Sequence, residues 1–125
     1  VHDLNHTLQS IKQLTHSKGS IVIAVPNLNS YDAQLYKEHW AGYDVPRHLY
    51  HFTQSSMHHL MKANGFKIKK VLPMVFDSYY VSLLSERYKT NKTHYLHSFI
   101  NGYKSNTYAR KTGEFSSLIY IINIK

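Results

Sequence analysis

An uninterrupted β-branched run constrains the fold of this chain most. Residues 20–25, Ser-Ile-Val-Ile-Ala-Val, lack the alternation of a half-buried strand and predict a strand covered on both faces. An amphipathic helix is predicted just before it, at residues 5–16, because apolar residues recur there at three- and four-residue spacing: Leu4, Leu8, Ile11 and Leu14. Ser17-Lys18-Gly19 is expected to end this helix, with the glycine in the left-handed conformation. Helix, short turn and buried strand together predict an α/β domain with a mainly parallel sheet.

The rest of the chain continues this pattern. Thr53 is a predicted N-cap for a helix over residues 54–63, which Asn64-Gly65 would end. A strand is expected over residues 66–75, with Phe66, Ile68 and Val71 toward the core. Two short helices (79–88 and 93–100) and a last apolar strand (116–124) follow. The expected organisation is one domain over 1–125, with a long loop at 27–53 and an insertion at 77–114.

Composition limits the classes of function. The 125 residues include no cysteine, which excludes disulfides and thiolate metal sites. No stretch approaches the roughly 18 apolar residues of a membrane span, so a soluble cytoplasmic protein without membrane contact is expected. The chain begins with Val1 rather than Met, and we expect it to be a piece of a longer protein.

The formal net charge is +8, which raises a second interpretation, a basic binding module for RNA or acidic ligands. The eleven tyrosines could stack on bases in such a module. The cations are scattered, however. Lys67, Lys69 and Lys70 alternate along a predicted strand, and no run of five basic residues occurs. A solvated surface therefore explains the charge better than a nucleic-acid footprint.

Several strings give a more specific indication. Residues 19–27, Gly-Ser-Ile-Val-Ile-Ala-Val-Pro-Asn, and residues 62–66, Lys-Ala-Asn-Gly-Phe, stand at the start of two predicted strands. Residues 40–52 read Trp-Ala-Gly-Tyr-Asp-Val-Pro-Arg-His-Leu-Tyr-His-Phe. Together these strings resemble the C-terminal half of class I S-adenosylmethionine-dependent methyltransferases, in a bacterial subgroup of generic methyltransferases. The resemblance implies a partial Rossmann-like sheet of strands five, six and seven with flanking helices, in which the antiparallel seventh strand (116–124) lies between the other two.

The resemblance also implies what this chain lacks. Members of the family bind the cofactor S-adenosylmethionine with a glycine-rich turn and an acidic residue that accepts from the ribose. The five glycines here are isolated, and no cofactor-binding residue is identified. We therefore expect the chain alone to be inactive and to require a missing N-terminal half. Without that half the strand at 20–25 would lose a neighbour, which predicts self-association.

The loop at 27–53 contains the candidate acceptor-binding residues. Transfer of a methyl group to a small-molecule acceptor needs positioning and, for a hydroxyl or amine, a base. Trp40 is a candidate wall, Asp44 and Arg47 a candidate clamp, and His48 and His51 candidate catalytic bases. The alternative is structural: Arg47 pairs with Asp44 to hold the loop, and His48 caps a backbone group.

The insertion at 77–114 resembles a lid. Residues 77–86 are interpreted as a lid helix over the acceptor site, with Tyr80 as a substrate contact, and plain packing is the alternative. The ten histidines form close pairs, but no His-Glu-x-x-His arrangement joins them. No native metal site is therefore expected.

Overall fold

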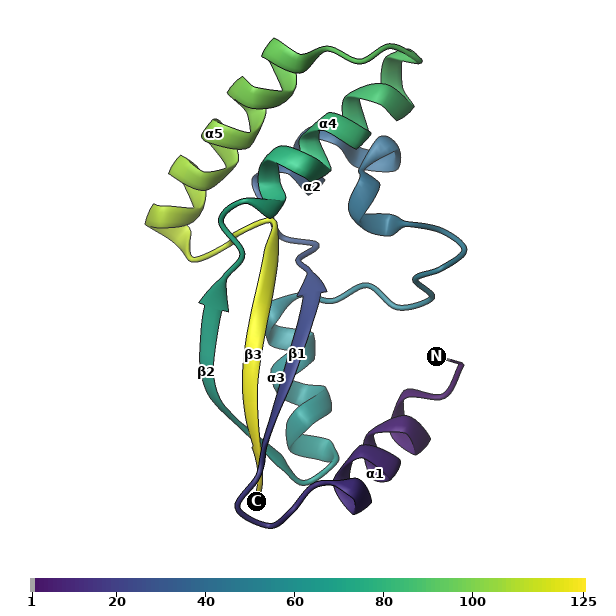
Figure 1. The fold of residues 1–125 in the computed structure, drawn as a ribbon, viewed down its shortest axis with the longest axis vertical. Coiled ribbons are helices and arrows are strands. Elements are labelled where there is room, and N and C mark those ends of the chain that lie inside the picture. Colours follow the sequence, from purple (N-terminus) through teal and green to yellow (C-terminus); the bar gives the residue numbers. More distant parts are fainter. Residues whose placement is uncertain (1) are drawn as a thin grey trace.

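A computed structural model describes residues 2–125 as a three-stranded sheet with helices on one face and at one end (Figure 1). The elements in chain order are α1 (Leu4–Leu14), β1 (Ser20–Pro26), α2 (Tyr31–Tyr36), the 3-10 turns η1 (Lys37–His39) and η2 (Ala41–Tyr43), α3 (Gln54–Ala63), β2 (Phe66–Pro73), α4 (Asp77–Thr90), α5 (Tyr95–Thr112) and β3 (Ser117–Ile124). The α/β class predicted from the sequence is confirmed.

The last strand lies in the middle of the sheet. The strand order is β1-β3-β2, and β3 is antiparallel to both neighbours. Tyr120 on β3 is paired with Ile23 on one side and Val71 on the other. The predicted insertion of an antiparallel last strand between the other two is confirmed. The expectation of a mainly parallel sheet is wrong for these strands, because β1 and β2 run the same way but are joined only through β3.

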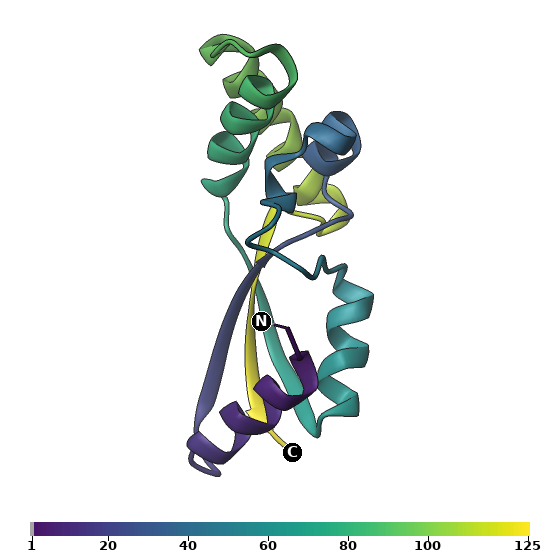
Figure 2. The same cartoon turned by 90° about the vertical axis from the view of Figure 1, so that its right-hand side faces the viewer.

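Strand β1 is covered on one face only. Its burial alternates, and Val22 is 65% exposed while Ile21 and Ile23 are partly buried. Figure 2 shows the reason, since α1 and α3 lie on the same side of the sheet. The predicted burial on both faces is therefore wrong for residues 2–125, in which the opposite face of β1 has no covering helix.

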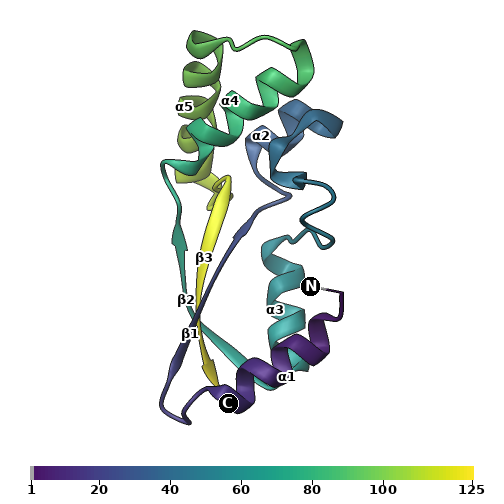
Figure 3. The same ribbon diagram turned by 45° about the vertical axis from the view of Figure 1, so that its right-hand side comes forward.

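Two hydrophobic clusters organise the interior. The first lies between the sheet and the helices α1 and α3: Leu8, Met57, Met61, Phe66, Leu118, Tyr120 and Ile122. The second lies beyond the carboxyl ends of β1 and β2, where α2, η2 and α4 meet (Figure 3): Ala33, Tyr36, Trp40, Ala41 and Val81. Burial of large apolar side chains in each cluster stabilises both parts of the fold.

Local signals fix most element boundaries. Thr53 caps α3 through a reciprocal pair of hydrogen bonds with Ser56, and Gly65 follows the helix with φ +76°, so both predicted ends of α3 are confirmed. The role expected of Gly19 is wrong, because α1 already ends at Thr15 in an extended conformation. The second helix of the insertion, α5, is longer than predicted and ends before Gly113, which has φ +80°.

Candidate functional site

The long loop, residues 27–53, begins and ends beside the carboxyl end of β1. Asn27 forms a parallel bridge with Phe52, and the Leu28 amide donates to the Phe52 carbonyl at 2.8 Å. The Asn27 side chain is buried and donates to Glu114 Oε2 at 2.7 Å and to the Phe115 carbonyl. The two ends of the loop are thereby held together, and residues 28–51 project beyond the carboxyl end of β1. The loop is not irregular throughout, because α2, η1 and η2 lie within it.

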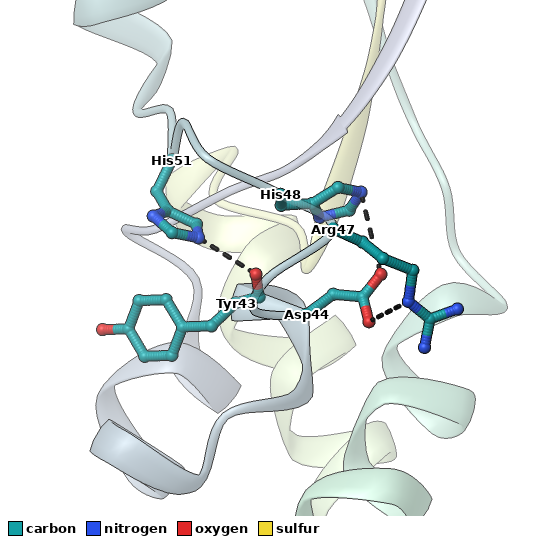
Figure 4. Close-up of polar contacts among 5 residues, drawn as sticks. All are labelled: Tyr43, Asp44, Arg47, His48 and His51. Carbon is teal, nitrogen blue, oxygen red and sulfur yellow. Dashed lines mark hydrogen bonds and ion pairs between the residues drawn. The ribbon is translucent and has the colours of Figure 1, made fainter. Parts of the chain in front are cut away.

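Asp44, Arg47 and His48 form one polar cluster in this loop (Figure 4). Asp44 has a left-handed backbone (φ 41°), and its carbonyl accepts from the His48 amide at 3.0 Å. Arg47 Nε lies 3.1 Å from Asp44 Oδ1, and His48 Nε2 lies 4.0 Å from Asp44 Oδ2. The pairing of Arg47 with Asp44 confirms one part of the structural interpretation. The Arg47 side chain remains 80% exposed, and its terminal nitrogens point away from Asp44 in Figure 4.

His51 lies on the other side of the same turn. Its Nε2 is 3.0 Å from the Tyr43 carbonyl, and its ring lies edge-on to the Tyr43 ring at 4.9 Å between centroids. Because a carbonyl oxygen only accepts, the proton of a neutral imidazole lies on Nε2 and leaves Nδ1 as the basic nitrogen. His51 is thus oriented by the backbone, as a candidate base must be.

An apolar cavity opens beside the cluster. Its volume is about 250 Å³, and Arg47, His48 and Tyr50 line it together with apolar side chains from α1, β1 and α3. The apolar lining consists of Leu4, Leu8, Ile23, Ala24, Val25, Pro26, Leu49, Phe52, Met57, Leu60 and Met61. Sequence reasoning missed these residues as a site, although the helical spacing of the leucines and methionines marks them as inward-facing.

Trp40 lies apart from the cavity. It is 2% exposed, belongs to the second hydrophobic cluster, and donates through Nε1 to Asp32 Oδ2 at 2.9 Å. Its ring lies edge-on to Tyr43 at 5.3 Å between centroids. Trp40 therefore contacts Tyr43, whose ring contacts His51 in turn, and the contact of Trp40 with an acceptor stays a prediction.

Tyr80 also lies elsewhere. It is exposed on α4 and lines an open hollow with neighbouring residues: Pro73, Met74, Val75, Phe76, Asp77 and Ile119. The structure therefore brings Asp44, Arg47 and His48 together and places His51 against Tyr43. His51, Trp40 and Tyr80 all lie outside the cavity lining. The role of Tyr80 stays a prediction.

The sequence did not reveal two buried carboxylates, Asp32 on α2 within the loop and Glu86 on α4. Asp32 is fully buried and accepts from Trp40, Ser105 and Ser116. Glu86 accepts from the Tyr36 hydroxyl at 3.1 Å, and Asn101 donates to both. Burial raises the pKa of Tyr36 to about 12, Asn101 opposes the rise, and the Glu86 carboxylate adds to it. Both carboxylates accept hydrogen bonds from side chains of this chain.

The residues that the structure describes, 2–125, do not fit the cofactor site that the resemblance implies. A ribose diol needs a free carboxylate beside a glycine-rich turn. Beyond the end of β1, Asp32 is enclosed and Asp44 is paired with Arg47. Among residues 2–125, no three His, Asp or Glu side chains converge as metal ligands. Over the same residues, no helix has the length and apolarity to span a bilayer.

Comparison with protein families identifies a related domain. A family model described as a methyltransferase domain matches residues 1–71, which is more than half of the 125 residues. The matched region contains α1, β1, the polar cluster and α3. No curated protein and no solved structure matches the chain.

Proposed function

Since the chain belongs to the methyltransferase domain family, we propose that it forms the acceptor-binding part of an S-adenosylmethionine-dependent methyltransferase that acts on a small molecule. One observation carries the proposal. Arg47 and His48 line an apolar cavity of about 250 Å³ beside the carboxyl end of β1, and Asp44 holds Arg47 there. Open α/β sheets bind ligands beyond the carboxyl ends of their strands.

The cavity indicates the kind of acceptor. Small-molecule sites usually measure roughly 300 to 1,000 Å³, so a cavity of about 250 Å³ holds only part of a typical ligand. We infer an acceptor that places an apolar group between α1 and α3 and leaves a polar group at Arg47 and His48. The terminal nitrogens of Arg47 suit a carboxylate or another anionic group.

The histidines are the proposed bases. His48 lines the cavity and can take a proton from a hydroxyl or amine at its mouth, and Asp44 then stabilises the imidazolium. His51 is outside the lining and is the second candidate, with Nδ1 as its basic nitrogen. A preceding segment that carries the glycine-rich turn and the ribose carboxylate is proposed to bind the cofactor, so the chain alone is proposed to be inactive.

Methyl transfer in a protein that joins this chain to such a cofactor-binding half tests the proposal. The probes are 4-butylphenol and 4-butylbenzoate with an isotopically labelled methyl donor. Arg47→Gln and His48→Gln should each lower kcat/KM by at least about tenfold, which corresponds to 1.4 kcal/mol. The cofactor Kd should stay within about threefold.

Lys18→Gln is the matched control, because Lys18 is exposed in the turn at the far end of β1 and should change neither quantity. Loss of cofactor binding in Arg47→Gln at unchanged stability would assign the cluster to the cofactor. Equal activity of both site variants and the control would remove the cluster from the acceptor site.

A further inference from the structure

Helix α5 presents large apolar side chains to solvent. Leu96, Phe99, Ile100 and Tyr103 are 70%, 62%, 39% and 58% exposed. Their spacing of three, four and seven residues places them on one face of the helix. A stripe of this period normally packs into a core. Here its four side chains are exposed instead, on a helix that lies at the helical end of the molecule (Figures 1 and 3).

The opposite face of α5 is made of small residues. Ser98, Gly102, Ser105 and Ala109 are buried, and a Cβ at Gly102 would lie 2.6 Å from Tyr79 Cδ1 and 3.0 Å from Tyr79 Cα. The Ser105 hydroxyl also donates to the buried Asp32 at 2.8 Å. This close packing fixes the rotation of α5, so the apolar stripe cannot turn inward.

The surroundings of the stripe are cationic. Residues 77–112 contain six lysines and arginines: Arg87, Lys89, Lys92, Lys104, Arg110 and Lys111. The same range contains two acidic residues, of which Glu86 is buried and Asp77 accepts a hydrogen bond from Ser117. Lys104 stands four residues after Ile100, and Arg110 and Lys111 stand seven and eight residues after Tyr103. These spacings place the three cations beside the same face of the helix. The exposed charge of the α4–α5 hairpin is therefore positive.

We propose that this face of the α4–α5 hairpin binds an anionic lipid surface. Apolar side chains enter the boundary between headgroups and acyl chains, tyrosines suit the headgroup level, and flanking lysines and arginines attract anionic lipids. A second copy of the chain would bring like charges together, and a nucleic acid would leave Leu96, Phe99 and Ile100 exposed. No helix in residues 2–125 spans a bilayer, so the hairpin lies on the surface rather than across it.

The position of the hairpin relates lipid binding to the candidate acceptor site. The hairpin follows the carboxyl end of β2, and the loop that contains the polar cluster follows the carboxyl end of β1, at the same end of the sheet (Figure 1). Attachment through α5 would hold the candidate acceptor site near the lipid surface. The binding itself depends only on the exposed stripe and the cations, and not on the proposed methyl transfer.

Co-sedimentation with vesicles tests the proposal. The chain should bind vesicles of phosphatidylcholine with 30% phosphatidylserine at least about tenfold more tightly than pure phosphatidylcholine, and 0.5 M salt should weaken the binding. The double variant Leu96→Ser, Phe99→Ser should lose at least about tenfold in affinity. The pair Leu14→Ser, Val45→Ser is the matched control, because both residues are exposed and apolar but lie outside the hairpin.

Circular dichroism of each variant separates lost binding from lost folding. The charge variant Lys104→Gln, Lys111→Gln should weaken binding to the anionic vesicles and leave binding to neutral vesicles unchanged. Equal vesicle binding by the stripe and control pairs would overturn the proposal. Binding to a 20-nucleotide single strand without binding to vesicles would also overturn it, and so would stripe-dependent dimerisation of a chain that does not bind vesicles.

Discussion

Asp32 connects the sheet to the helices beyond it. Its carboxylate is fully buried and accepts from Trp40 Nε1 at 2.9 Å, Ser105 Oγ at 2.8 Å and Ser116 Oγ at 2.7 Å. The donors come from the loop after β1, from α5 and from the residue before β3. A buried charged acceptor with several donors is costly to remove, because each donor then stays buried without a partner.

Replacement of Asp32 should therefore destabilise the chain strongly. Asp32→Ala should lower the free energy of unfolding by at least about 3 kcal/mol, since three buried donors lose their acceptor. Urea unfolding followed by Trp40 fluorescence measures this change. Glu38→Ala, at an exposed carboxylate, should stay within about 0.5 kcal/mol. A loss below 1 kcal/mol in Asp32→Ala would mean that water replaces the carboxylate.

Tyr36 predicts a pH dependence at the alkaline end. Burial raises its pKa to about 12, and Glu86 adds to the rise although Asn101 opposes it. The unfolded chain has the ordinary tyrosine pKa of about 10, so between pH 10 and 12 the folded chain binds more protons. Stability is therefore fully present below pH 10 and falls as the pH rises toward 12.

Tyr36→Phe removes this titration. Its free energy of unfolding should fall less steeply than that of the wild type between pH 10 and 12, as measured by urea unfolding across that range. Tyr88→Phe, at an exposed tyrosine, should keep the wild-type slope. Equal slopes in wild type and Tyr36→Phe would show that another group controls alkaline stability.

The candidate site shows which residues the sequence could predict. The structural interpretation, in which Arg47 pairs with Asp44, could be proposed from the sequence because the two residues are three positions apart. Asp32 was missed because two of its donors are 73 and 84 residues away. Trp40 was predicted to be a wall because aromatic residues often line ligand sites, whereas its ring is buried in the cluster where α2, η2 and α4 meet.

Elements with complete local signals were predicted best. The bounds of α3 follow from the Thr53 cap and the glycine at 65, and these signals need no tertiary context. The length of α5 was underestimated, because its large apolar residues face solvent and its buried face consists of small residues. In such a helix the periodic apolar residues mark the exposed face, so their pattern does not identify the face that packs into the core.

Gly102 is the residue that allows α4 and α5 to approach closely. In an exposed helix, Gly→Ala stabilises by about 1 kcal/mol through propensity. Here the added methyl would lie 3.0 Å from Tyr79 Cα, and overpacking costs about 1 to 3 kcal/mol. Gly102→Ala should therefore give a net loss of stability of about 1 kcal/mol in urea unfolding.

Thr107→Ala, on the exposed side of α5, is the matched control and should be close to neutral. Stabilisation by Gly102→Ala would mean that the two helices separate without cost. In that case the rotation of α5 would not be fixed by its small residues.

At the scale of the whole molecule, β1 is one of the two open edges of the sheet, and β2, which carries Lys67, Lys69 and Lys70, is the other. Among residues 2–125 no strand pairs with the outer side of β1, and Ile21, Val22, Ile23 and Val25 carry no charge that would oppose pairing. We therefore propose that the isolated chain self-associates through β1. Light scattering after size exclusion at about 100 µM should give a mass above 14.6 kDa.

Val22→Lys should increase the fraction of monomer, because the lysine places a charge on the exposed face of β1. Val45→Lys alters an exposed loop residue and should leave the mass unchanged. A wild-type chain that remains monomeric at about 100 µM would show that the β1 edge is not an association surface. The order of the sheet would be unaffected by that result.

The sheet order and the polar cluster were predicted from local strings and their resemblance to a family. The exposure of β1 was not, because it depends on which helices are present to cover the sheet. The same dependence underlies the account of function, in which this chain supplies acceptor-side residues and another segment supplies the cofactor site.

Calorimetric titration of the chain with S-adenosylmethionine to about 1 mM tests this account most directly. The isolated glycines and the enclosed or paired carboxylates at Asp32 and Asp44 predict no binding tighter than a Kd of about 10 µM. A Kd at or below about 10 µM, which corresponds to roughly −7 kcal/mol, would contradict it. The cofactor site would then lie within the chain itself.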